Sequence, residues 1–115
     1  MNKYEKNIEE LDIEIPEPPK PVGAYVPATR VSAINCLAAI KGEIGSLNEI
    51  KKIVKVRGFV SSAQGFNEQP EVVNGASEIL HEIFGENGVH ARSAVGVSEL
   101  PINIPVEVEM VVSIK

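Results

Sequence analysis

The sequence has no tryptophan, and aromatic residues make up only 4% of it. Proteins that bind single-stranded nucleic acid without sequence preference stack the bases on aromatic side chains, so this composition argues against that class. The formal net charge of −5 points the same way, because contact with a phosphate backbone normally requires a basic face. We therefore do not expect a nucleic acid as a partner.

Cysteine and histidine are also scarce. The one cysteine, Cys36, cannot form an internal disulfide, and the two histidines, His81 and His90, give no metal-ligand spacing. We expect no metal site and no cofactor. Cys36 falls near the apolar stripe of a predicted helix, which favours a small buried side chain over a nucleophile.

Long apolar runs are absent, so no segment is expected to span a bilayer. The first residues, MNKYEKNIEELDIEI, are charged and lack the apolar core of a signal peptide, which predicts a cytoplasmic protein. A length of 115 residues predicts one domain. We divide it into an N-terminal arm over residues 1–20 and a domain over residues 21–115. Within the arm, Asn7 to Leu11 is predicted to form a short helical turn, and Pro16 to Pro21 an extended segment.

The residue periodicity predicts an α+β fold, with a mixed sheet and two helices packed on one face. The predicted elements before the C-terminal end are an edge strand over Val22 to Thr29, a helix over Arg30 to Ile44, a strand over Ile50 to Ser61 and a helix over Pro70 to Phe84. Gly45 is expected to end the first helix, and Gly85 and Gly88 the second.

The strand over Ile50 to Ser61 is predicted to have two distinct faces. Simple alternation places Val54, Val56 and Val60 on one face, and Ile53, Lys55, Arg57 and Phe59 on the other. Gly58 is expected to mark a bulge or a close approach of another backbone.

Two further runs of strand-like alternation occupy the C-terminal end, HARSAVGVSELPINIPVEVEMVVSIK. The second run has one apolar face, formed by Val106, Val108, Met110, Val112 and Ile114. If the two runs pair antiparallel, Arg92 and Glu107 can share a face. Such a pair is either a cross-strand ion pair, contributing about 0.2–1 kcal/mol, or part of a ligand site.

This C-terminal string, preceded by GFVSSAQGFNEQPEVVNGASEILHEIFGENG, resembles the RidA (YjgF) family of reactive-intermediate deaminases, also labelled L-PSP endoribonucleases. The resemblance runs from about Ala33 to the end, and it is closest to the YjgF/chorismate mutase-like bacterial subgroup. It implies a homotrimer with ligand clefts between neighbouring subunits. Family members carry a further hairpin after the first strand; here Arg30 runs directly into VSAINCLAAI, so that segment is missing.

The resemblance also assigns roles to residues. It implies that Arg92 holds a substrate carboxylate, that Glu107 positions a water as the catalytic base, and that Tyr25 lines the cleft. Ala94 departs from the cysteine that many deaminating members have at this position.

Three functional classes remain open. The first is hydrolysis of 2-imino or enamine acids to 2-oxo acids and ammonia. The second is a non-catalytic trimeric binder of small carboxylates, which the missing hairpin favours. The family's ribonuclease label fits less well, because the chain is acidic and has no basic cleft. Chorismate mutase activity would require more cationic residues than Arg92 alone.

Overall fold

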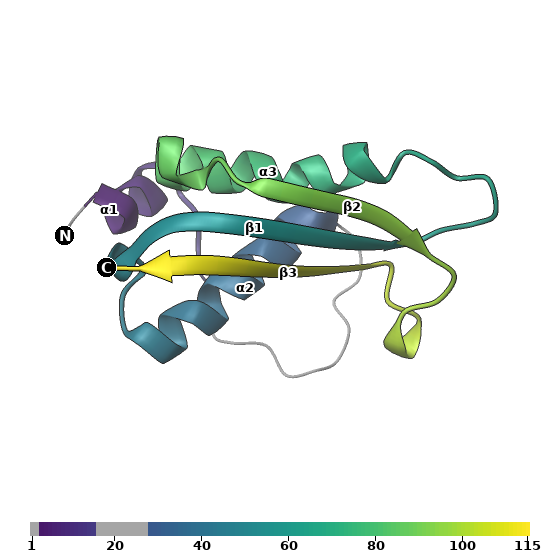
Figure 1. Cartoon of the computed structure of the whole chain (residues 1–115). Helices are drawn as coiled ribbons and strands as arrows, with labels where there is room; N and C mark the ends of the chain where they lie inside the picture. Colours follow the sequence, from purple (N-terminus) through teal and green to yellow (C-terminus); the bar gives the residue numbers. More distant parts are fainter. Residues whose placement is uncertain (1–2, 16–27) are drawn as a thin grey trace.

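The computed structural model describes residues 3–15 and 28–115, and the predicted extended segment over Pro16 to Pro21 lies outside them. The described residues form an α+β fold with a three-stranded mixed sheet (Figure 1). The α-helices are α1 (Lys3–Glu10), α2 (Ala28–Ile44) and α3 (Gln69–Phe84). The strands are β1 (Ile50–Ser61), β2 (Ala91–Val97) and β3 (Val106–Ile114). Short 3₁₀ turns, η1 (Leu47–Glu49), η2 (Gly85–Gly88) and η3 (Pro101–Asn103), link them.

The strand order is β2-β1-β3, with β1 parallel to β2 and antiparallel to β3. The conditional pairing of the two C-terminal strands is therefore wrong, because β1 lies between them. The reason is the connection through α3, which carries the chain back across the sheet and returns it parallel to β1, as a helical crossover does.

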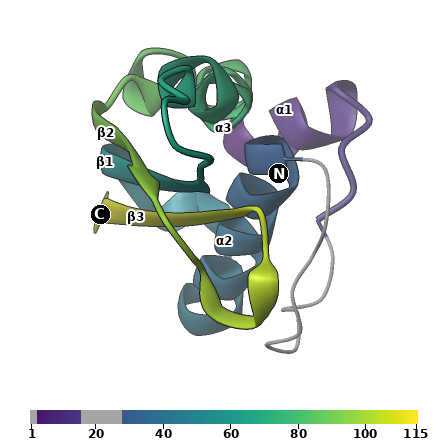
Figure 2. The ribbon, with the colours of Figure 1, turned by 90° about the vertical axis from the view of Figure 1, so that its right-hand side faces the viewer.

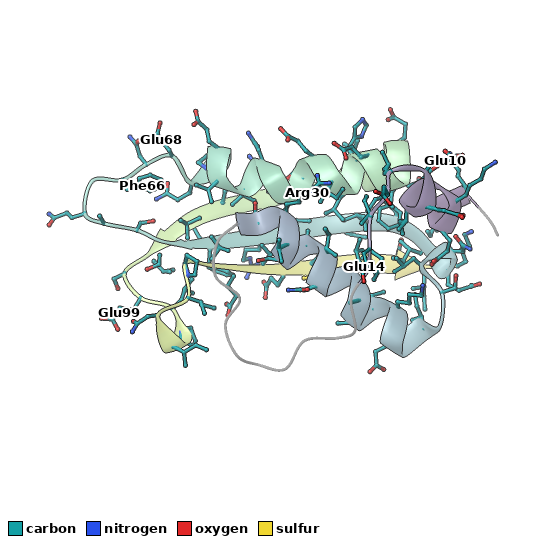
Figure 3. The ribbon with its side chains drawn as sticks, turned by 180° about the vertical axis from the view of Figure 1, so that it is seen from behind. Glu10, Glu14, Arg30, Phe66, Glu68 and Glu99 are labelled. Atoms are coloured by element: carbon teal, nitrogen blue, oxygen red, sulfur yellow. The ribbon has the colours of Figure 1, made fainter. Side chains whose placement is uncertain are left out.

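All three helices lie on one side of the sheet, as Figure 2 shows with the strands at the left. Seen from behind in Figure 3, α2 crosses the strands obliquely and α3 runs along the upper edge of the sheet. The predicted arrangement of two helices on one sheet face is thus confirmed, and α1 adds a third helix beside α3.

The core lies between the sheet and the helices. Its buried apolar side chains come from all three α-helices, from η1 and from β1. The members that are fully buried include Leu37, Leu47, Ile50, Ile53, Val56, Ile79, Leu80, Ile83 and Phe84. The N-terminal helix belongs to this core as well, because Tyr4 and Ile8 are buried and the Tyr4 ring meets Phe84 edge-on at 4.8 Å.

The predicted faces of β1 need one correction. Ile53 and Val56 are both buried under the helices, whereas Val54 is exposed. The pairing with β3 shifts between Ile53 and Lys55, and this irregularity breaks the strict alternation on which the prediction relied. From Val56 onward the alternation holds, so Gly58 and Val60 also face the helices.

Gly58 lies where α3 comes closest to the sheet. A Cβ atom at this position would stand 2.5 and 2.9 Å from the two methyl groups of Val73, so no larger residue fits without movement. Neither expected cause, a bulge or a close approach of another backbone, is found at Gly58. The group that comes close is the Val73 side chain of α3, and the irregularities of β1 lie nearer its start.

The bounds of the predicted edge strand and the last residue of β3 differ from expectation. The edge strand predicted over Val22 to Thr29 falls outside the described residues up to position 27, and its last two residues are instead the start of α2. Gly45 ends α2 with a positive φ of 85°, as expected. In β3, Val106, Val108, Met110 and Val112 face the core as predicted, but Ile114 at the strand end is exposed.

Within the described residues, we find no helix that combines the length and the apolar character needed to cross a membrane.

Candidate functional site

Arg92 lies near the start of β2, on the sheet face that α3 covers. Its register partner on β1 is Val56, which is buried under the helices, so the two side chains share that face. Because β2 is an edge strand, the guanidinium reaches past the core to the surface beside α3.

Two side chains of α3 orient the guanidinium. Arg92 Nη1 donates to Asn74 Oδ1 at 2.7 Å and to Ser77 Oγ at 3.3 Å. Asn74 and Ser77 are three residues apart, which places them one above the other on the same helix face. No carboxylate in residues 3–15 or 28–115 forms an ion pair with Arg92. Its charge is therefore available to an anion from outside the chain.

Asn74, Ser77 and Arg92 form a polar cluster with His90, which lies in the segment just before β2. Its Nδ1 lies 2.6 Å from the carbonyl oxygen of Gly88, and its Nε2 lies 3.0 Å from Ser77 Oγ. Gly88 packs so tightly against the backbone of α3 at Leu80 that a Cβ atom would overlap the carbonyl there. The close packing of η2 on α3 thus sets the position of His90.

The cluster opens into a surface cavity of about 340 Å³. The lining residues come from the second half of α3, from η2 and from the start of β2: Asn74, Ser77, His81, Gly88, Val89, His90 and Arg92. Beside it lies a second hollow of about 380 Å³, lined by Ser77, Glu78, His81 and Glu82, so the two share one wall. Both of the chain's histidines line the first cavity.

Glu107 does not line this cavity. It pairs with Phe59 on β1, and this register position faces away from the helices. Arg92 and Glu107 are therefore on opposite faces of the sheet, with β1 between their strands. The cross-strand ion pair that the structure does contain joins Arg57 Nη1 to Glu109 Oε1 at 3.2 Å, and both side chains are largely exposed.

The remaining predicted residues are placed as follows. Tyr25 lies outside the described residues. Cys36 is half-buried on α2, where its thiol donates to the carbonyl oxygen of Val108 at 3.4 Å, and burial raises the pKa of this thiol to about 11. That environment suits the predicted packing role, since the reactive thiolate form is disfavoured. Ala94, like Arg92, faces the helices.

Sequence reasoning did not single out Asn74 and Ser77, and it assigned no motif to His90. The spacing of Asn74 and Ser77 was a usable signal, because residues three apart on a helix point the same way. The sequence could not show that the start of β2 packs against this face of α3. We find no group of three or more metal-ligating side chains within reach of one ion in the described parts of the chain.

Comparisons with known proteins extend this description. Protein TCP17 from Trypanosoma cruzi is 41% identical over 88 residues, which cover 76% of this chain and 55% of that protein. The chain thus spans about half the length of this relative. The crystal structure of a protein of unknown function from Agrobacterium tumefaciens superposes with a TM-score of 0.84 at 31% identity, over 98% of this chain and 94% of the other.

A putative endoribonuclease from Shewanella oneidensis MR-1 has the same fold, with a TM-score of 0.87 at 24% identity and coverage of 98% and 100%. The family model described as YjgF/chorismate mutase-like, putative endoribonuclease, matches residues 20–113. That range contains β1, β2, all of β3 but its last residue, the helices α2 and α3, and the Arg92 cavity. The chain belongs to the YjgF/chorismate mutase-like family.

Proposed function

We propose that this protein hydrolyses 2-imino or enamine acids to 2-oxo acids and ammonia, in a cleft between subunits of a homotrimer in the cytoplasm. The observation that carries this proposal is the Arg92 guanidinium, which forms no ion pair within residues 3–15 and 28–115 and is oriented by Asn74 and Ser77 at a cavity. A guanidinium offers parallel donors that match the two oxygens of a carboxylate. A 2-imino acid bound there would present its C=N carbon next to the anchored carboxylate.

The role of Glu107 in this proposal depends on assembly. Since Glu107 and Arg92 of one chain face opposite sides of the sheet, the glutamate that positions water has to come from a neighbouring subunit. The sheet face that carries Glu107 also carries Val95 and Val111, which are 42% and 57% exposed. Burial of this face between subunits would remove apolar surface from water, which favours association. Tyr25 would line the same cleft.

Mixed trimers test the shared site directly. We expect Arg92→Gln and Glu107→Gln each to lower strongly the turnover of imines, which are generated in situ by an amino-acid oxidase and followed by competition with semicarbazide. When the two variants are unfolded together and refolded as mixed trimers, some interfaces regain an intact arginine from one chain and an intact glutamate from the next. Recovery of activity is then expected; no recovery from two variants that each form trimers would refute the shared site.

Single substitutions separate binding from catalysis. Arg92→Lys keeps the charge but loses the two-donor geometry, so the affinity for a 2-oxo acid, measured by thermal shift, should fall about tenfold or more. Glu107→Gln should leave that affinity nearly unchanged while lowering kcat by roughly 10²–10⁴-fold, because it removes a base. Glu99→Gln, at another exposed glutamate, is the matched control and should change neither quantity.

Two outcomes would replace the proposal. A parent protein that binds 2-oxo acids through Arg92 but never turns over imines is a carboxylate-binding protein. Sedimentation as a monomer at micromolar concentration would remove the inter-subunit cleft altogether.

A further inference from the structure

The hydrogen bonds around His90 form a continuous series from a backbone carbonyl to a side-chain hydroxyl. Gly88 O lies 2.6 Å from His90 Nδ1, and His90 Nε2 lies 3.0 Å from Ser77 Oγ. The imine chemistry proposed above uses neither His90 nor the Ser77 hydroxyl as a reacting group. This pair therefore calls for its own explanation.

The direction of these hydrogen bonds follows from the chemistry of the groups. A carbonyl oxygen can only accept, so the Nδ1 atom of His90 carries the hydrogen. In the neutral imidazole the other nitrogen is then an acceptor, and the Ser77 hydroxyl donates to it. A hydroxyl that donates to an imidazole, itself held by a third group, is the arrangement that activates a serine as a nucleophile.

Arg92 supplies a further element of such a site. Its Nη1 lies 3.3 Å from Ser77 Oγ and is held in place by Asn74. A carbonyl carbon attacked by Ser77 would place its oxygen close to this guanidinium. Fixed donors at the position where negative charge develops are a strong source of transition-state stabilisation.

The surroundings allow a substrate to reach these atoms. Ser77, His90 and Arg92 all line the same surface cavity of about 340 Å³. Ser77 and His90 are half-buried, so the hydroxyl is neither sealed in the core nor fully surrounded by water. A cavity of this size admits a small ester.

We propose that Ser77 is a nucleophile, with His90 as its general base and Arg92 as the oxyanion donor, and that this cavity hydrolyses small carboxylic esters. Ser77 Oγ forms a bond to the acyl carbon, and its proton passes to His90 Nε2. The bond to the alcohol oxygen then breaks, and the departing alcohol takes that proton. Water attacks the acyl-serine and gives a proton to His90; the acid leaves, and that proton returns to Ser77 Oγ.

A purely structural role makes a different prediction. If the Ser77–His90 hydrogen bond only holds η2 against α3, its removal lowers stability and leaves no chemical signature on Ser77. The two roles are therefore separated by a measurement of covalent modification, which does not depend on whether the protein hydrolyses imines.

The experiment incubates the full chain with p-nitrophenyl acetate, follows release of p-nitrophenol, and maps the acetylated residue by peptide mass spectrometry after a rapid acid quench. We expect acetyl-Ser77 in the parent and p-nitrophenol release beyond one equivalent. His90→Gln should lower the rate of Ser77 acetylation by roughly 10²–10⁴-fold. Arg92→Gln should lower it by roughly 10²–10³-fold.

A matched control is available outside the cavity. Ser98→Ala removes the hydroxyl of an exposed serine that does not line the cavity, and should leave the rate unchanged. Ser77→Ala removes the nucleophile and should give no acetylation at position 77. If this variant fails to fold, Ser77→Cys provides a second variant, whose thiol should be acetylated with the same dependence on His90.

Three results would overturn the proposal. One is acetylation of lysines with none on Ser77. Another is a rate of Ser77 acetylation that His90→Gln does not change. The third is a stable acetyl-Ser77 without further release of p-nitrophenol, which would refute the hydrolytic step.

Discussion

The contact between Gly58 and Val73 makes the sharpest prediction about stability. Gly58 is buried on the helix-covered face of β1, and Val73 is fully buried on α3 above it. We expect Gly58→Ala to destabilise the fold, because the added methyl group would stand 2.5 Å from one Val73 methyl and 2.9 Å from the other. Carbon atoms that are not bonded prefer separations of about 3.5–4.0 Å.

The magnitude follows from two opposing effects. Overpacking of a well-filled core costs about 1–3 kcal/mol. Alanine offsets about 0.5–1 kcal/mol of this cost relative to glycine inside a strand, because it has less backbone freedom in the unfolded chain and so loses less of it on folding. We therefore expect a net loss of about 1 kcal/mol, and at most about 2.5 kcal/mol, in the free energy of unfolding for Gly58→Ala.

A double-mutant cycle tests whether the clash with Val73 causes the loss of stability in Gly58→Ala. Val73→Ala alone removes buried methyl groups and should cost about 2–3 kcal/mol. In the double variant the new methyl of residue 58 enters the vacated space, so the total loss should be about 1–2 kcal/mol smaller than the two single losses added together. Urea unfolding followed by far-ultraviolet circular dichroism suits a chain without tryptophan.

Additivity within about 0.5 kcal/mol would refute this reasoning, since it would mean that residues 58 and 73 do not meet. A Gly58→Ala variant more stable than the parent would refute it as well, by showing that the strand and α3 separate without cost.

Other predictions follow from single side chains. Leu80→Ala should lower the free energy of unfolding by roughly 2–5 kcal/mol, because Leu80 is fully buried; a urea-derived change below 0.5 kcal/mol would mean it packs elsewhere. Thr29→Val should cost about 1–3 kcal/mol by the same assay, since the buried Thr29 hydroxyl donates to Val72 O at 2.5 Å and accepts from Ala76 N at 3.1 Å; no loss would contradict this role. Burial raises the pKa of Cys36 to about 11, so the folded protein should react with iodoacetamide at pH 8 far more slowly than the urea-unfolded chain, and equal rates would contradict this.

The sequence by itself was sufficient to predict β1 and α3. The strand over Ile50 to Ser61 and the helix ending at Phe84 were predicted with bounds that agree to within a residue. The reason is physical: apolar residues recur every three or four positions along α3, and a glycine, Gly85, follows where this helix ends. The family resemblance also came from sequence, because the motifs around Arg92 and Glu107 are contiguous stretches of chain.

Only the tertiary structure decided which strands are neighbours. Alternation along β2 and β3 is the same whether they pair with each other or flank a third strand, so the place of β1 between them could not be read from their residues. The local irregularity near Ile53 likewise arises from pairing with β3.

For the candidate site too, the sequence identified one residue and the tertiary structure determined its neighbours. The type and position of Arg92 were evident from the sequence, but its surroundings were not. Ser77 and His90 meet because η2 packs on α3 and brings two segments 13 residues apart to within 3.0 Å. A hydrogen bond between side chains depends on the packing of both elements that carry them, and packing is a property of the whole fold.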